Sequence, residues 1–327
     1  MYNARFPALL FSNGLGDHFL NLPAVRALSG LFPGRLTLVG QSNVSRLFFS
    51  KLRLRKICDV PMITACGGRK FDADGVAAAV GPCDLLISLN PWHSPSVDRL
   101  LQRLAPRVSV GFFREFEHHV MLNFNKHSAE LAFDIPRVFD RSLRLEKFAG
   151  PPAFDSRFVL QARRVRRALP ADVRVLAVHA DTEAPKMWPR QRFIKLLDMF
   201  LQRHPDFVAI IVGRSDMRFD RGRQANRIIP CYGLPFVTSA LLVGLSDLFV
   251  GVDSSMLHAA DLFRVPGVGI FGSTSPGEWG FKFGVHRHIR ARGKLATLRE
   301  ALVLDALEQV LPGNVSPRRA EFAVHSL

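Results

Sequence analysis

The 327-residue chain has little of the chemistry that marks several common protein classes. Its four cysteines (Cys58, Cys66, Cys83 and Cys231) form no Cys-x-x-Cys pair and have no ligand-like spacing with histidines, so neither a zinc site nor a disulfide framework is indicated. No apolar run approaches the roughly 20 residues of a membrane span, and the N-terminus lacks a signal-peptide pattern. No low-complexity block or internal repeat is evident. These absences favour a folded cytoplasmic protein.

Acidic residues are also scarce. The chain has 28 Asp and Glu against 44 Lys and Arg, which gives a formal net charge of +16. A surface this basic attracts polyanions such as nucleic acid, a nucleotide, a phosphorylated glycolipid or an anionic membrane. Charge alone does not choose among these partners, although no recognised nucleic-acid-binding motif supports the first.

Short apolar runs alternate with amphipathic segments along both halves of the chain. This alternation predicts an α/β protein with parallel sheets and crossover helices. Strands are expected at 6–11, 35–39, 56–60, 84–89 and 108–112, and again at 173–179, 207–212, 246–251 and 268–271. Helices are expected at 18–32, 41–53, 97–104, 157–169, 191–203, within 232–245, and at 295–311. Residues 113–150 are less regular. The economical interpretation is two Rossmann-like domains, 1–152 and 153–311, joined at Gly150-Pro151-Pro152 and followed by a polar tail, 312–327.

The stretch from Gly251 to Gly280 carries the strongest local signal. A short apolar strand leads into Asp253, Ser254 and Ser255, all good helix N-cap residues. The first turn of a helix has free N–H groups and a partial positive charge, so it suits a phosphate. His258 follows one turn later on the same face. A diphosphate site is one interpretation of this stretch, and a capped helix with an ordinary turn is the other.

Three segments, taken in order, resemble the bacterial heptosyltransferases of glycosyltransferase family 9. They are GLGDHFLNLPAVRALSGLFPGRLTLVG at 14–40, VHADTEAPKMWPRQRF at 178–193 and FVGVDSSMLHAADLFRVPGVGIFGSTSPGEWG at 249–280. The resemblance implies the GT-B fold, in which two Rossmann-like domains with parallel sheets face a central cleft. It further implies inverting transfer of heptose from ADP-heptose to an acceptor hydroxyl, as in lipopolysaccharide biosynthesis, with no metal or other cofactor.

The same resemblance implies roles for particular residues. Asp17 would be the general base, and Lys186 would neutralise the diphosphate leaving group. The expected donor-binding residues are His179, Lys186, Trp188, Asp253, Ser254, Ser255, His258 and Thr274. The expected acceptor-binding residues, in loops of the first half, are Gly14, Gly16, His18, Trp92, His93 and Arg114. The last three are expected there because aromatic and basic groups suit a phosphorylated sugar, and core aromatics with a solvated helix are the open alternative. Structural alternatives stay open: Asp17 as an N-cap, Trp188 as loop packing, and His18 as a partly buried histidine.

Two positions depart from the family pattern. Ser255 stands where the family commonly has glycine, and His179-Ala180-Asp181 replaces the usual His-Pro-Gly. These changes leave room for another donor or for a non-catalytic nucleotide-sugar-binding protein of the same fold. The acceptor also stays open among a phosphorylated glycolipid, a protein and a small molecule, with peripheral contact to an anionic membrane as a further expectation.

Overall fold

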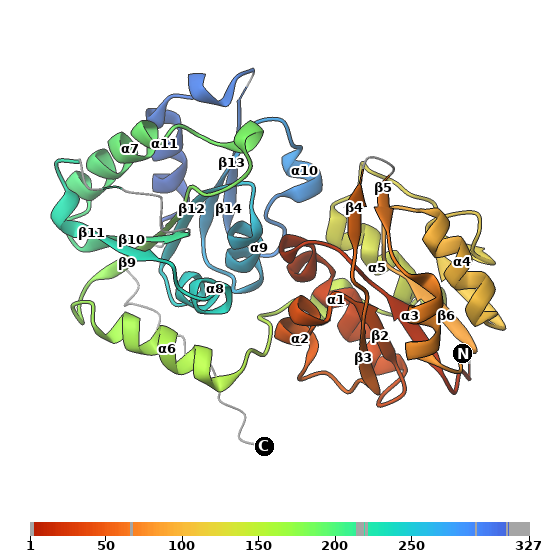
Figure 1. Ribbon diagram of the computed structural model, residues 1–327. Coiled ribbons are helices and arrows are strands. Elements are labelled where there is room, and N and C mark those ends of the chain that lie inside the picture. Colours follow the sequence, from red (N-terminus) through yellow and green to blue (C-terminus); the bar gives the residue numbers. More distant parts are fainter. Residues whose placement is uncertain are drawn as a thin grey trace. The chain divides into compact units, whose positions relative to one another are not determined.

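The computed structural model describes residues 3–65, 68–213, 219, 222–291, 293–311 and 313. Cys66 and the expected polar tail, apart from Gly313, lie outside the described residues. The chain divides after Ala153 into two compact units, each built on one sheet (Figure 1). Among the described helices, none combines the length and the apolar character that crossing a membrane requires.

The first unit is organised by a six-stranded parallel sheet in the order β3-β2-β1-β6-β7-β8. Its strands are β1 (Pro7–Leu10), β2 (Thr37–Gly40), β3 (Lys56–Asp59), β6 (Leu85–Ser88), β7 (Val108–Gly111) and β8 (His118–His119). The central strands β1, β2 and β6 are buried at every position. Continuous apolar runs of this kind are typical of parallel strands covered on both faces.

Helices α1 (Leu15–Leu31), α2 (Ser42–Phe49), α3 (Ala73–Val80), α4 (Pro95–Leu104) and α5 (Ser128–Phe139) surround this sheet. α1 packs against α5, and α3 packs against α4. Local chemistry fixes several ends. The Asp72 carboxylate accepts a hydrogen bond from Gly75 N at the start of α3, and Pro95 occupies the first turn of α4, where a missing N–H costs nothing. A hairpin of β4 (Ile63–Ala65) and β5 (Gly68–Lys70) leads from β3 to α3.

The segment that closes the first unit is held by a half-buried arginine of α1. Arg26 donates to the carbonyl oxygens of Phe148, Gly150 and Pro151 at 3.0, 2.8 and 2.6 Å. Burial lowers the pKa of Arg26 from its ordinary value. The three carbonyls compensate the desolvated guanidinium, so the Gly-Pro-Pro segment is a fixed part of the structure at this point.

The second unit repeats the topology of the first. Its parallel sheet has the order β11-β10-β9-β12-β13-β14. The strands are β9 (Arg174–His179), β10 (Phe207–Gly213), β11 (Ile228–Tyr232), β12 (Leu248–Val252), β13 (Gly267–Phe271) and β14 (His286–Arg290). The helices are α6 (Ser156–Arg167), α7 (Arg190–Arg203), α8 (Phe236–Gly244), α9 (Ser255–Leu262), α10 (Pro276–Trp279) and α11 (Glu300–Val310). In both units the strands, numbered along the chain within the sheet, run 3-2-1-4-5-6, the doubly wound order.

The α/β class with two Rossmann-like parallel sheets is therefore confirmed, while several local predictions are wrong. α3, α5, β11, β14 and the β4–β5 hairpin were not expected. The single helix expected at 295–311 is broken: a 3₁₀ turn at Leu295–Thr297 is followed by extended backbone at Leu298 and Arg299, and only then by α11. The break has a tertiary cause, because the Leu298 carbonyl accepts a hydrogen bond from the buried Trp188 indole at 3.1 Å.

Candidate functional site

Each sheet has one point where the winding direction reverses. In the first unit the reversal lies between β1 and β6, and in the second between β9 and β12. Connections leave neighbouring strands in opposite directions at such a point, so the carboxyl ends of the two strands border a crevice where ligands of open α/β sheets bind. The predicted site residues are divided between these two edges.

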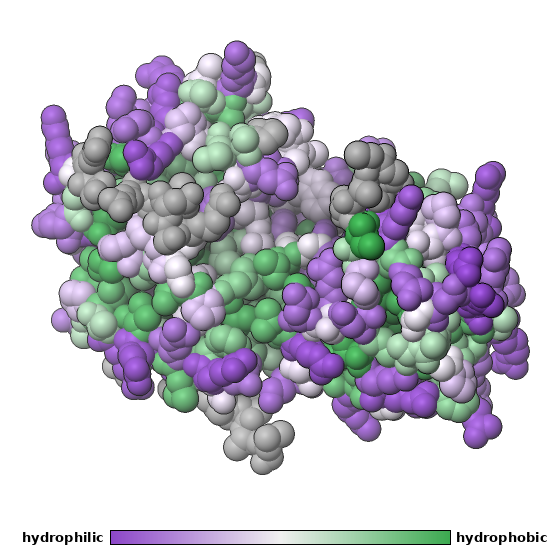
Figure 2. Space-filling view, in the orientation of Figure 1, coloured by the Kyte–Doolittle hydropathy of each residue, from purple (hydrophilic) through white to green (hydrophobic). Residues whose placement is uncertain are grey.

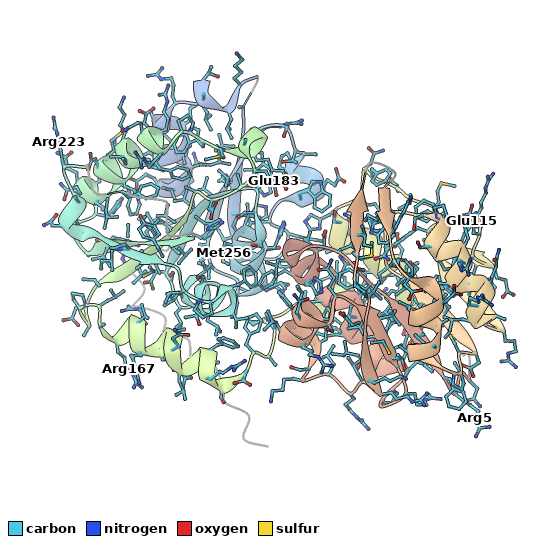
Figure 3. The ribbon with its side chains drawn as sticks, viewed as in Figure 1. Arg5, Glu115, Arg167, Glu183, Arg223 and Met256 are labelled. Atoms are coloured by element: carbon cyan, nitrogen blue, oxygen red, sulfur yellow. The ribbon has the colours of Figure 1, made fainter. Side chains whose placement is uncertain are left out.

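In the second unit, an ion pair joins the loops that follow β9 and β12. Lys186 Nζ lies 3.0 Å from Asp253 Oδ2, and the Asp253 side chain is only 5% exposed against 30% for Lys186. The Thr182 hydroxyl donates to the Asp253 carbonyl oxygen at 3.1 Å and ties the same two loops. Figure 3 labels Glu183 and Met256, which mark the β9–α7 loop and the first turn of α9. The switch point thus holds a partly accessible ammonium fixed by a buried carboxylate.

The N-terminus of α9 has a polar group with no protein partner. Ser254 is the N-cap residue in extended conformation, yet its side chain makes no capping hydrogen bond, and its Oγ is buried without a partner. Thr274 Oγ1, in the loop after β13, is buried without a partner as well. Buried hydroxyls are normally hydrogen-bonded, so orphaned ones at a helix N-terminus indicate an anionic ligand. Ser255 occupies the first position of α9 and His258 lies buried one turn later.

His179 and Gly213 shape the carboxyl end of β9, and the backbone at Gly213 favours glycine over any other residue. His179 Nδ1 lies 2.9 Å from the Val212 carbonyl oxygen. Gly213 has φ +149°, a conformation open essentially to glycine, and a Cβ there would meet Asp181 Cβ at 3.3 Å. Asp181, one of the two departures from the family pattern, therefore packs against the end of β10.

Trp188 lies in the core of the second unit. The side chain is 1% exposed, its ring packs edge-on against Phe193 at 4.7 Å between centroids, and its indole N–H is bonded to the Leu298 carbonyl. A ring so enclosed supports the Lys186 loop from beneath. The packing alternative for Trp188 fits this geometry better than direct contact with a donor.

A cavity of about 630 Å³ lies at the carboxyl ends of β13 and β14. It is lined by Ser273, Arg290 and Lys294 together with glycine backbone. The loop that forms one wall continues into Thr274, so this basic recess adjoins the loop that carries one of the orphaned hydroxyls.

In the first unit, Asp17 lies in the first turn of α1 and is half-buried. Its Oδ2 accepts a hydrogen bond from Gly14 N at 2.9 Å, which is one half of a capping box, because glycine has no side chain to supply the other half. Gly14 has φ −69°, and a Cβ there would make only ordinary contact with Asp17. The turn therefore does not require glycine at position 14, because its backbone angles are open to any residue and a side chain there would fit within the protein. Gly16 follows in the same turn.

Asn13 is the centre of a polar network that sequence reasoning missed. Its Oδ1 accepts hydrogen bonds from Trp92 Nε1 at 2.8 Å and Arg69 Nη1 at 2.7 Å, while its Nδ2 donates to Asn90 Oδ1 at 3.2 Å. The Arg69 guanidinium lies over the Trp92 ring, 5.0 Å from its centroid. Asn90 Oδ1 also accepts from Ser12 N. The network joins the loops after β1 and β6 to the β4–β5 hairpin.

Further orphaned polar atoms gather at this edge. They are Ser12 Oγ, Asn90 Nδ2, His93 Nδ1 and Ser94 Oγ, each buried and without a hydrogen-bond partner. His93 is held from its other side, where Nε2 lies 2.8 Å from Asp98 Oδ1. Arg114 extends into solvent with a side chain 91% exposed. A polar ligand that reached these loops would find both donors and acceptors available.

His18 is enclosed in the core of the first unit. Its side chain has no exposed surface, Nδ1 lies 2.8 Å from the Gly14 carbonyl oxygen, and the ring stacks on Phe49 at 5.4 Å between centroids. Burial lowers the pKa of His18 to about 4, against a smaller opposing effect of the Gly14 carbonyl. The ring therefore stays neutral near pH 7 and fixes the turn that carries Asp17.

The residues missed here share one signal. Ser12, Asn13 and Asn90 are polar residues directly after buried strands, where a parallel sheet exposes its carboxyl edge. Arg69 gave no such signal, because the unexpected hairpin brings it to the site. Among the described residues, no group of three or more His, Cys, Asp or Glu side chains is arranged to hold a metal ion.

Solved structures share this architecture over nearly the whole chain. A glycosyltransferase of family 9 from Veillonella parvula superposes with a TM-score of 0.75 at 16% identity, covering 94% of this chain and 97% of its own. Escherichia coli ADP-heptose LPS heptosyltransferase II gives 0.67 at 13% identity, with coverages of 94% and 98%. E. coli heptosyltransferase WaaC, solved with ADP, gives 0.65 at 16% identity, with coverages of 93% and 99%. These similarities define the fold as that of the GT-B heptosyltransferases.

The sequence profile described as "Glycosyltransferase family 9 (heptosyltransferase)" matches residues 97–298. No sequence among the curated proteins matches the chain. The profile match covers more than half of the chain and extends across both units, and the chain therefore belongs to glycosyltransferase family 9. It is a glycosyltransferase, as the motifs at 14–40, 178–193 and 249–280 predicted.

The buried His18 makes stability pH-dependent. Its pKa falls from 6.5 in the unfolded chain to about 4 in the folded protein, so the unfolded state binds more protons between these values. Its contribution to stability is therefore lost as pH falls from 6.5 towards 4, by about 2–3 kcal/mol in total. Urea unfolding of the wild type and of His18→Gln from pH 7 to 4.5 measures this difference. Parallel pH profiles for the two proteins would contradict it.

Proposed function

We propose that this glycosyltransferase moves heptose from ADP-heptose to an acceptor hydroxyl with inversion at the anomeric carbon. The observation that carries the proposal is the Lys186–Asp253 ion pair beside the partnerless Ser254 hydroxyl at the β9/β12 switch point. Solved relatives of the same fold were obtained with ADP and with ADP-2-deoxy-2-fluoro heptose, which supports this donor. The second unit is the proposed donor domain and the first is the proposed acceptor domain.

The donor diphosphate binds at the first turn of α9. Its oxygens accept hydrogen bonds from the N-terminal amides of the helix and from the hydroxyls of Ser254 and Thr274. Lys186 moves from Asp253 towards the diphosphate and neutralises the charge that grows as ADP departs. Asp253, repelled by phosphate, accepts hydrogen bonds from sugar hydroxyls. The donor also contacts His179, Ser255 and His258, whereas Trp188 supports the loop.

The acceptor binds at the carboxyl edge of the first sheet. Asp17 removes the proton from its hydroxyl as the oxygen attacks the anomeric carbon and the bond to the diphosphate breaks. The products are the glycosylated acceptor with inverted configuration and ADP. Asn13, Trp92 and Arg69 form a polar and aromatic platform beside Asp17. Gly14, Gly16 and His93 border it, Arg114 offers a charge at the rim, and His18 acts indirectly by fixing the turn.

An Asp17→Asn variant separates the chemical role from the structural one. Asparagine retains an oxygen that can accept the Gly14 N–H bond, so α1 remains capped and the unfolding midpoint stays near that of the wild type. The amide cannot take a proton, so kcat falls by about 10² to 10⁴. ADP release from ADP-heptose, with heptose-deficient lipopolysaccharide as acceptor, measures the rate. Full transfer by Asp17→Asn would remove Asp17 from the base role, and Asp17→Ala shows the cost of losing the cap.

A double-mutant cycle on Lys186 and Asp253 separates the contribution of the ion pair to stability from the contribution of Lys186 to ADP binding. Lys186→Met leaves a buried carboxylate unpaired, which costs about 3–5 kcal/mol of stability, and it removes a charge-assisted contact to the diphosphate, which weakens ADP binding about 10- to 100-fold. Adding Asp253→Asn removes the orphaned charge and restores much of the stability without restoring ADP binding. Urea unfolding and calorimetric titration with ADP measure the two effects.

The cycle also tests the competing roles of Lys186. If ADP binds Lys186→Met as tightly as the wild type while stability falls, Lys186 is only the structural partner of Asp253. Titration with GDP and UDP in the same experiment tests whether the donor carries adenine. A protein that binds ADP-heptose but releases no ADP with any acceptor would be a nucleotide-sugar-binding protein without turnover.

A further inference from the structure

α6 is the most basic helix among the described residues of the second unit. Its sequence, SRFVLQARRVRR, contains five arginines and no acidic residue. Only Ala162 is fully buried in it. Five of its twelve residues are exposed and six are half-buried, so one side of the helix faces solvent while the other packs on its unit.

The inner face of α6 is identified by its contacts. Gln161 Oε1 accepts a hydrogen bond from the Thr238 hydroxyl of α8 at 2.7 Å, and Arg166 Nη2 donates to the Val173 carbonyl at 3.1 Å. The helix packs on α8, whose sequence FVTSALLVG has no charged residue. α8 itself therefore offers no carboxylate to the arginines of α6.

The opposite side is a stripe of Arg157, Leu160, Arg164 and Arg167, here called the outer face of α6. These residues are spaced i, i+3, i+7 and i+10, which places them on one side of a helix. All four are exposed, and the Leu160 residue is 64% accessible. Figure 3 labels Arg167 near the end of α6. In Figure 2, hydrophilic side chains lie among apolar ones along the lower edge of the unit, where Figure 1 shows α6.

One residue departs from the pattern of an ordinary surface helix. Arginines that face solvent are usual, but Leu160 also stands in solvent, among three arginines. The nearest acidic residue in sequence, the N-cap Asp155, lies 3.9 Å from Arg157 Nε and partly balances that end only. Arg164 and Arg167, one turn apart, form the charged end of the stripe.

We propose that the outer face of α6 docks on an anionic lipid bilayer. Guanidinium groups bind lipid phosphates with two parallel hydrogen bonds, and a leucine at the centre of the stripe can enter the headgroup region. Nucleic acid would satisfy the arginines but offers nothing to Leu160. The proposal does not depend on the donor or the acceptor proposed above. If the proposal holds, the arginines of α6 are the part of the +16 net charge that binds the membrane.

The test is binding of the full-length protein to vesicles. The wild type is expected to sediment with vesicles of phosphatidylcholine and phosphatidylglycerol (3:1) and not with phosphatidylcholine alone, and to lose this binding in high salt. Each arginine near an anionic surface contributes about fivefold, so Arg164→Gln/Arg167→Gln weakens binding by about 25-fold. Glutamine is also a good helix former, so the fold is retained.

A matched control removes the same charge elsewhere on the same unit. Arg203→Gln/Arg223→Gln alters two exposed arginines outside α6 and is expected to change vesicle binding less than threefold. Equal losses in the two double variants would show that binding follows total charge, and the assignment to α6 would be wrong. Absence of binding to the anionic vesicles would overturn the proposal as well.

Substitutions at Leu160 test whether this residue enters the headgroup region, which a purely electrostatic attraction would not require. Leu160→Trp is expected to gain a fluorescence component that brominated phosphatidylglycerol quenches, beyond the quenching of the wild-type tryptophans. Leu160→Gln is expected to weaken vesicle binding with the charge unchanged. A parallel titration with a 30-base-pair duplex separates the rival partner. If duplex binding depends on Arg164 and Arg167 and the fluorescence of the Leu160→Trp variant is not quenched, the partner of the outer face of α6 is nucleic acid. That result would contradict the proposal of membrane binding.

Discussion

The reversal of winding direction in each sheet is the constraint on which the rest of the molecule depends. At β1/β6 and at β9/β12, two neighbouring strands send their connections to opposite faces, so no crossover covers the gap between their carboxyl ends. Ser12, Asn90, Ser94 and Ser254 carry orphaned polar atoms for this topological reason, and Thr274 does so one strand away.

The second edge illustrates how much depends on one ion pair. Asp253 is almost fully enclosed, and an unpaired carboxylate there would be strongly unfavourable, so Lys186 is required for stability before any ligand arrives. In the proposed reaction, Lys186 can therefore leave Asp253 for a phosphate only if other groups, such as sugar hydroxyls, take its place at the carboxylate. Trp188 and Leu298 anchor the loop behind it, and so the ammonium is positioned by the hydrophobic core as much as by its charge.

The sequence was sufficient for features that depend on local pattern and insufficient for those that depend on tertiary contacts. Buried parallel strands produce continuous apolar runs, so most strands, the doubled Rossmann-like architecture and the strand-end position of Asp17 and Ser254 were predictable. β14 was not, because its sequence HRHIR is polar and lies at a sheet edge. The buried states of His18 and Trp188 depend on Phe49 and Leu298, which are distant in sequence, and Trp188 also packs on the nearby Phe193. Arg69 is 56 residues from Asn13 in sequence and reaches it through the β4–β5 hairpin, which no sequence pattern predicted.

The two departures from the family pattern differ in what they mean physically. Ser255 occupies the first helical position of α9, where backbone angles are those of an ordinary helix, so a side chain there requires no unusual conformation. In the proposed donor site, its hydroxyl would offer a phosphate one more hydrogen-bond donor next to Ser254. Asp181 is different, because its side chain packs against Gly213 at the end of β10. Its side chain lies beside the end of β10, and in the proposed donor site we expect its negative charge to affect the choice of nucleoside or sugar.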